Sequence, residues 1–154
     1  MSETDIDSAS TPLPLPLSID AAKPRALAVI LLVEDEEFVR EVVADILEFE
    51  GYRVFRARNA DEAKAAFHRY GEIVRLLITD VVLPGQNGLD LARELRSDDP
   101  SLRVLFVSGF PENTWTRQEH LHGENFYLPK PFSAESLMRA VRQALVFHFE
   151  EVAI

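Results

Sequence analysis

Residues 27–37 read Leu27-Ala28-Val29-Ile30-Leu31-Leu32-Val33-Glu34-Asp35-Glu36-Glu37 and give the clearest indication of the fold. In this stretch seven apolar residues run directly into four acidic ones. A continuous apolar run of this length is typical of a strand buried on both faces of a parallel sheet. The acids then follow the end of that strand, and ligands bind at this edge of open α/β sheets. The stretch therefore predicts a buried strand that carries carboxylates to a binding edge.

Short apolar runs alternate with helical patterns along the rest of the chain. Phe38, Val42, Ile46 and Phe49 recur at helical spacing, and Gly51 ends that pattern. Further strands are expected over residues 52–57, 74–79, 102–107 and 126–128, and further helices over about 60–70, 89–97 and from 133 onward. Five β-α units in series predict an α/β fold with a five-stranded parallel sheet and helices on both faces, which is a doubly wound (βα)5 architecture.

Composition excludes several classes of protein. The chain has 154 residues, 47% of them hydrophobic, so it can build one ordinary globular core. It has no cysteine, which excludes disulfides, thiolate nucleophiles and cysteine-ligated metals. No apolar run approaches the ~18–20 residues of a membrane span, and the acidic start differs from a basic secretory signal. We therefore expect a soluble, cytoplasmic protein with no membrane partner.

The charge balance bears on partners. There are 16 Lys+Arg and 26 Asp+Glu residues, so the formal net charge is −10. Binding to nucleic acid relies on Lys and Arg that neutralise phosphates, so we expect no direct contact with nucleic acid. The excess of acids favours solubility, and some of the carboxylates are also candidates to hold a cation.

Residues 1–25 are expected to form a flexible, semi-extended tail, and residues 26–154 the folded domain. The segment Pro12-Leu13-Pro14-Leu15-Pro16-Leu17 alternates proline with leucine and makes no regular helix. A plain flexible leader is the simpler interpretation. The alternative is that the three leucines dock on a groove of this or another chain.

Polar side chains follow four of the predicted strands. Glu34 and Asp35 follow the first strand, Asp80 the third, Ser108 the fourth and Lys130 the fifth. If these strands are near neighbours, three carboxylates, one hydroxyl and one ammonium group converge on one edge of the sheet. The sequence therefore predicts one functional site at that edge.

Clustered carboxylates repel one another, and Mg²⁺ is a hard cation that accepts such ligands together with water and phosphate oxygens. We expect Asp35 and Asp80 to bind Mg²⁺ directly, Glu34 to act through water, and the backbone carbonyl of Val82 to complete the shell. An ionised aspartate can also attack phosphorus, and Lys130 with the metal would neutralise the transferred charge. The cluster suits a carboxylate that receives a phosphoryl group.

Four segments together resemble the receiver domain of two-component response regulators: residues 32–36 (Leu-Val-Glu-Asp-Glu), 78–88 (Ile-Thr-Asp-Val-Val-Leu-Pro-Gly-Gln-Asn-Gly), 107–109 (Val-Ser-Gly) and 128–132 (Leu-Pro-Lys-Pro-Phe). The resemblance covers about residues 27–146 and implies a flavodoxin-like receiver domain over 26–154. It also implies a cis bond between Lys130 and Pro131. The roles that it implies for the site residues are Asp80 as the phosphoacceptor, Glu34 and Asp35 as the acidic pair, Ser108 as the switch hydroxyl, Lys130 as the lysine of the site and Tyr127 as the switch aromatic.

The resemblance implies a phosphorylation switch and not an enzyme with a free turnover substrate. A sensor histidine kinase or phosphotransfer protein would phosphorylate Asp80 with Mg²⁺ present. The face formed by the fourth helix, fifth strand and fifth helix would then change its binding to an unknown downstream protein. We expect a monomer or weak homodimer, either stand-alone or excised from a larger regulator or hybrid kinase.

Two alternatives stay open. A Mg²⁺-dependent phosphohydrolase with an aspartate nucleophile usually needs a second acid two residues later, where this chain has Val82. A pseudo-receiver would be an interaction module that is never phosphorylated. The chain also departs slightly from the family pattern, because Glu34 stands where aspartate is more common.

Overall fold

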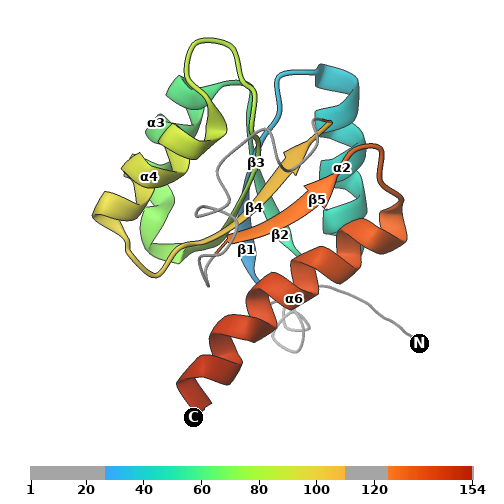
Figure 1. Cartoon of the computed structure of the whole chain (residues 1–154), viewed down its shortest axis with the longest axis vertical. Coiled ribbons are helices and arrows are strands. Elements are labelled where there is room, and N and C mark those ends of the chain that lie inside the picture. Colours follow the sequence, from blue (N-terminus) through green and yellow to red (C-terminus); the bar gives the residue numbers. More distant parts are fainter. Residues whose placement is uncertain (1–26, 110–124, 154) are drawn as a thin grey trace, which may run out of the picture.

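The computed structural model describes residues 27–109 and 125–153, and their side chains up to Val146. Within these ranges strands and helices alternate along the chain (Figure 1). The elements are β1 (Val29–Val33), α2 (Glu37–Phe49), β2 (Arg53–Ala57), α3 (Ala60–Tyr70), the 3-10 turn η2 (Gly71–Ile73), β3 (Val74–Asp80), α4 (Gly88–Asp98), β4 (Arg103–Ser108), β5 (Asn125–Pro129) and α6 (Ala134–Ala153).

The five strands form one sheet in the order β2-β1-β3-β4-β5, and every neighbouring pair is parallel. This confirms the doubly wound α/β fold expected from the sequence. The chain leaves β1 toward β2 and then crosses back to β3 on the other side of β1. The order therefore reverses between β1 and β3, and ligands bind at the carboxyl ends of strands at such a switch point.

Two apolar cores lie on the two faces of the sheet. One core joins the sheet to α2 and α6, and the other joins it to α3 and α4. The central strands β1, β3 and β4 are buried almost throughout, as their continuous apolar runs predict. Within the described part of the chain, none of the helices has both the length and the apolar character of a membrane span.

The predicted element boundaries agree with the described ones to within two residues. The stretch after β4 is different, because residues 110–124 lie outside the described residues. The fourth helix of the expected switching face belongs to that stretch, and residues 1–26 with the Leu-Pro segment are also outside the description.

The apolar residues whose spacing predicts helix α2 are not the residues that it buries. The helix is confirmed, but Phe38, Val42 and Phe49, whose spacing predicts it, are 78%, 40% and 89% exposed. The face that packs on the sheet carries Arg40, Val43, Ala44 and Leu47. Because α2 has apolar residues on two faces, their period identifies a helix without identifying its buried side.

Candidate functional site

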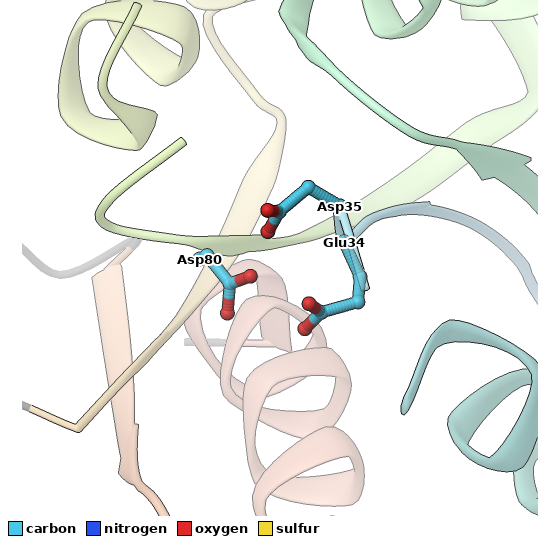
Figure 2. Close-up of side chains that lie close together, drawn as sticks. All are labelled: Glu34, Asp35 and Asp80. Carbon is cyan, nitrogen blue, oxygen red and sulfur yellow. The ribbon is translucent and has the colours of Figure 1, made fainter. Parts of the chain in front are cut away.

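Three carboxylates meet at the carboxyl ends of β1 and β3. Carboxylate oxygens of Glu34, Asp35 and Asp80 lie within 4.8 Å of one another, and Figure 2 shows the three groups facing a common space. The Glu34 and Asp80 residues are buried, at 5% and 6% exposure, whereas Asp35 is exposed. The structure therefore brings together the three acids that the sequence placed at one edge.

Local backbone contacts fix Asp80 at the end of β3. Val81 donates its N–H to the carbonyl of Val107 in β4, and Gly88 donates its N–H to the carbonyl of Val81 at 2.6 Å. A Cβ atom at Gly88 would collide with the backbone oxygen of Asp80. The start of α4 can therefore lie directly against the Asp80 backbone only because residue 88 is glycine.

Lys130 supplies the cation of the cluster. Its Nζ lies 3.0 Å from Asp80 Oδ1 and 3.4 Å from Glu34 Oε1. The backbone N–H of Lys130 donates to the carbonyl of Ser108 at 2.8 Å, which ties the segment after β5 to the end of β4. The expected cis bond between Lys130 and Pro131 is present.

The electrostatics of the cluster follow from burial and crowding. Burial raises the pKa of Asp80, and the neighbouring Glu34 raises it further, while Lys130 lowers it in part; the resulting pKa is about 7. Burial lowers the pKa of Lys130, but Asp80 and Glu34 more than offset this and raise it above its ordinary value. One ammonium group therefore compensates the carboxylates incompletely, and the site favours additional positive charge.

Two contacts hold the acidic loop after β1. The Glu36 N–H donates to Glu34 Oε2 at 3.0 Å, and Arg40 Nη1 donates to the Glu34 carbonyl at 3.0 Å. Arg40 is 8% exposed on the inner face of α2. Sequence reasoning missed Arg40, because no local pattern marks a buried arginine. The role of Gly88 was also missed, although a glycine at the end of the loop after Asp80 is a sequence signal for a close approach of the backbone.

The other predicted site residues lie at the end of β4, just after β3 and within β5. Ser108 is buried at the end of β4, one residue after Val107, which pairs with Asp80 in the sheet register. Val82 follows Asp80 by two residues and its side chain is 56% exposed. Tyr127 is half-buried in β5 opposite Phe106 and packs against the core on the α3 and α4 face.

The donor set suits a hard divalent cation. The cluster offers carboxylate oxygens only, two from buried residues and one from the exposed Asp35. Mg²⁺ prefers oxygen ligands and usually keeps several waters, which an open side at Asp35 permits. Glu34, Asp35 and Asp80 are therefore the residues that fit Mg²⁺.

Comparison with known proteins identifies the class. Residues 30–142 match the family model of the response regulator receiver domain, and the chain belongs to this family. Receiver domains of this family are parts of two-component signalling systems. The match runs from the second residue of β1 into the first half of α6, and so includes the elements that bear the acidic cluster and Lys130.

Particular relatives differ in length. The chain is 37% identical over 118 residues to the sensor kinase CckA of Brucella abortus (strain 2308), covering 77% of this chain and 12% of that protein. It is 38% identical over 117 residues to the aerobic respiration control protein ArcA of Escherichia coli (strain K12), covering 75% of this chain and 48% of ArcA. Over 118 residues it is 31% identical to the response regulator receiver protein CpdR of Brucella abortus, covering 76% and 96%.

A solved structure agrees with the fold. A response regulator receiver domain protein from Clostridium thermocellum superposes with a TM-score of 0.74 at 26% identity, covering 83% of this chain and all of that one.

In length, the chain spans a small part of CckA, about half of ArcA and nearly all of CpdR.

Proposed function

We propose that Asp80 accepts a phosphoryl group from a sensor histidine kinase or phosphotransfer protein, and that the phosphorylated domain binds a downstream protein differently. The observation that carries this proposal is the Lys130 ammonium 3.0 Å from a buried Asp80, inside a cluster of three acids at the switch point of the sheet. Family membership and the CckA and ArcA similarities support a kinase partner. We take the receiver domain to extend over residues 26–154.

The transfer is a displacement at phosphorus. A carboxylate oxygen of Asp80 forms a bond to phosphorus while the bond to the donor imidazole nitrogen breaks, and that nitrogen keeps the electron pair. Lys130 lies where its ammonium can neutralise charge on the transferred group. Asp35, Asp80 and the Val82 carbonyl would hold Mg²⁺, with Glu34 acting through water, and the ion would supply further positive charge for the transfer.

The response to phosphorylation is a population shift. The added charge of the phosphoryl group favours a state in which the Ser108 hydroxyl donates to it and Tyr127 turns inward. The position of Ser108, directly after Val107, the strand partner of Asp80, supports this role. The product stays attached to the protein, so the domain is a switch with no free substrate to turn over.

Labelling by a small phosphodonor tests the acceptor. The chain is incubated with acetyl phosphate and Mg²⁺, and the phosphoryl adduct is read by intact mass. We expect Asp80→Asn to abolish the adduct and Asp90→Asn, which removes an exposed acid on α4, to leave it unchanged. Undiminished labelling of Asp80→Asn would overturn the assignment.

Metal binding is tested separately. Mg²⁺ titration followed by amide NMR shifts at the ends of β1 and β3 should saturate in the wild type and fail in Asp35→Ala. Glu37→Ala removes an exposed acid at the start of α2 and is the matched control. Metal binding without labelling by any of several donors would favour a pseudo-receiver, and steady release of phosphate from a free phosphoester would favour a phosphohydrolase.

A further inference from the structure

A pocket of about 600 Å³ opens between α2 and the segment that follows β5. Polar groups are few in it, and Glu36 and Lys130 supply the charged ones. The apolar side chains that the argument uses are Phe38, Val39, Val42 and Ile46 from α2, with Pro131 and Phe132 after β5.

The exposed apolar side chains of this pocket are typical of an interaction site. Phe38 and Val42 are one helical turn apart and strongly exposed, so they form a continuous apolar surface with the pocket walls. Apolar patches of this kind usually mark an interaction site. Phe49 of the same helix is even more exposed but does not line the pocket, so it serves as a comparison.

The chain before Leu27 is attached at the C-terminal end of α2, and the pocket extends along this helix to Glu36 at its start. The Leu27 N–H donates to the carbonyl of Gly51 at 3.0 Å, directly beyond the last turn of α2. The 13-residue helix α2 is about 20 Å long at 1.5 Å per residue. Residues 18–26 span up to roughly 30 Å when extended. The Leu-Pro segment therefore reaches every part of the pocket from its attachment point.

The chemistry of residues 12–17 matches the pocket. Alternating prolines fix the backbone in extended conformations and remove half of the N–H donors that burial would leave unpaired. Proline-rich segments bind grooves lined by aromatic side chains, and Phe38 and Phe132 provide such side chains here. Because the segment is part of the same chain, its effective concentration at the pocket is on the order of millimolar.

We propose that residues 12–17 dock in the pocket between α2 and the segment after β5 of their own chain, with Leu13, Leu15 and Leu17 against Phe38 and Val42. The docked segment adjoins the candidate site through two pocket residues. Lys130 contacts Asp80, and the backbone N–H of Glu36 contacts Glu34. This docking does not depend on phosphorylation of Asp80.

The absence of cysteine permits a direct test on the full chain. Ser10→Cys creates a single thiol for a nitroxide spin label, and its effect on backbone amides is measured by NMR. We expect loss of amide signal over residues 38–46. Adding Leu13→Ser, Leu15→Ser and Leu17→Ser should restore the signal, whereas the control Ile6→Ser, which changes an apolar residue outside the segment, should not.

A second pair of variants tests the pocket side. Phe38→Ser should also restore the signal, whereas Phe49→Ser, which removes a still more exposed ring outside the pocket, should leave the loss in place. Docking within one chain is distinguished from docking between two copies by mixing spin-labelled protein without ¹⁵N with ¹⁵N-enriched protein that carries no spin label. Loss of amide signal in this mixture would assign the pocket to a second copy and overturn the proposal. Full amide signal in the labelled wild type, or equal effects of Phe38→Ser and Phe49→Ser, overturns it as well.

Discussion

Helices α2 and α3 flank the same strand, β1, on opposite faces of the sheet, yet they distribute their side chains differently. Helix α3 follows the usual pattern, with Ala60, Ala63 and Phe67 buried. Helix α2 buries the charged Arg40 and exposes the aromatic Phe38. The difference separates a helix whose buried side chains pack in the core from one whose Arg40 contacts Glu34 of the candidate site and whose Phe38 lines the apolar pocket.

The two helices also begin differently. Asn59 caps α3 in the ordinary way, since its side chain accepts from the Glu62 N–H at 2.8 Å. Helix α2 has no side-chain cap from Glu36, and the Glu36 N–H instead donates to the carboxylate of Glu34. The start of α2 is thus held by a candidate metal-site residue.

The largest effect should come from the core under α3. Phe67→Ala removes a buried ring, and we expect it to lower the free energy of unfolding by about 3–5 kcal/mol. If α3 serves stability alone, the labelling rate of the folded protein by acetyl phosphate is unchanged. Urea denaturation gives the first quantity and intact mass the second. If the variant is labelled more slowly under conditions in which it is fully folded, then α3 also affects the candidate site and does not differ from α2 in this respect.

Asp80→Asn should raise stability in a chelating buffer. The folded pKa of about 7 lies above the ordinary value of 3.8, so the unfolded state ionises first as pH rises and wild-type stability falls between about pH 4 and 7. At 1.4 kcal/mol per pKa unit the gain for the variant at pH 8 has an upper bound of roughly 4 kcal/mol. Thermal unfolding at pH 4 and pH 8 measures it. Equal gains at both pH values, or the same gain in Asp90→Asn, would contradict the cause.

Arg40→Met should affect both stability and metal binding. The variant keeps an apolar stem but leaves the buried Glu34 carbonyl without its 3.0 Å donor, at a cost of about 1–3 kcal/mol. Because that donor holds the acidic loop, we also expect weaker Mg²⁺ binding in an NMR titration. Arg139→Met, which removes an exposed guanidinium from α6, is the control. Unchanged Mg²⁺ affinity would limit Arg40 to a structural role.

The helix caps give the smallest predicted difference. Asn59→Ala should cost about 1 kcal/mol, since it removes the side-chain acceptor at the start of α3. Glu36→Ala should change stability by less than about 0.5 kcal/mol, because the side chain of Glu36 caps nothing. Urea denaturation of both variants is the measurement. Equal losses would show that α2 is capped as α3 is.

The sequence predicted the sheet and the acidic trio because both depend on local signals. Buried parallel strands are continuous apolar runs, and Glu34, Asp35 and Asp80 directly follow two of them. It could not predict which face of α2 packs on the sheet, since both faces are apolar. Nor could the sequence predict the role of Arg40, because this side chain donates to the carbonyl of Glu34, six residues earlier. That carbonyl faces Arg40 only once the loop after β1 has folded.

Gly88 has a consequence for how mutational data on this domain should be interpreted. Any other residue there would collide with the Asp80 backbone, so a saturation scan scored by signalling output should find position 88 about as intolerant as position 80. On the proposed function the two intolerances have different causes, one steric and one chemical. Alanine at position 88 already carries the Cβ that collides with the Asp80 backbone, so even the smallest substitution displaces Asp80, and intolerance alone does not identify a residue with a chemical role.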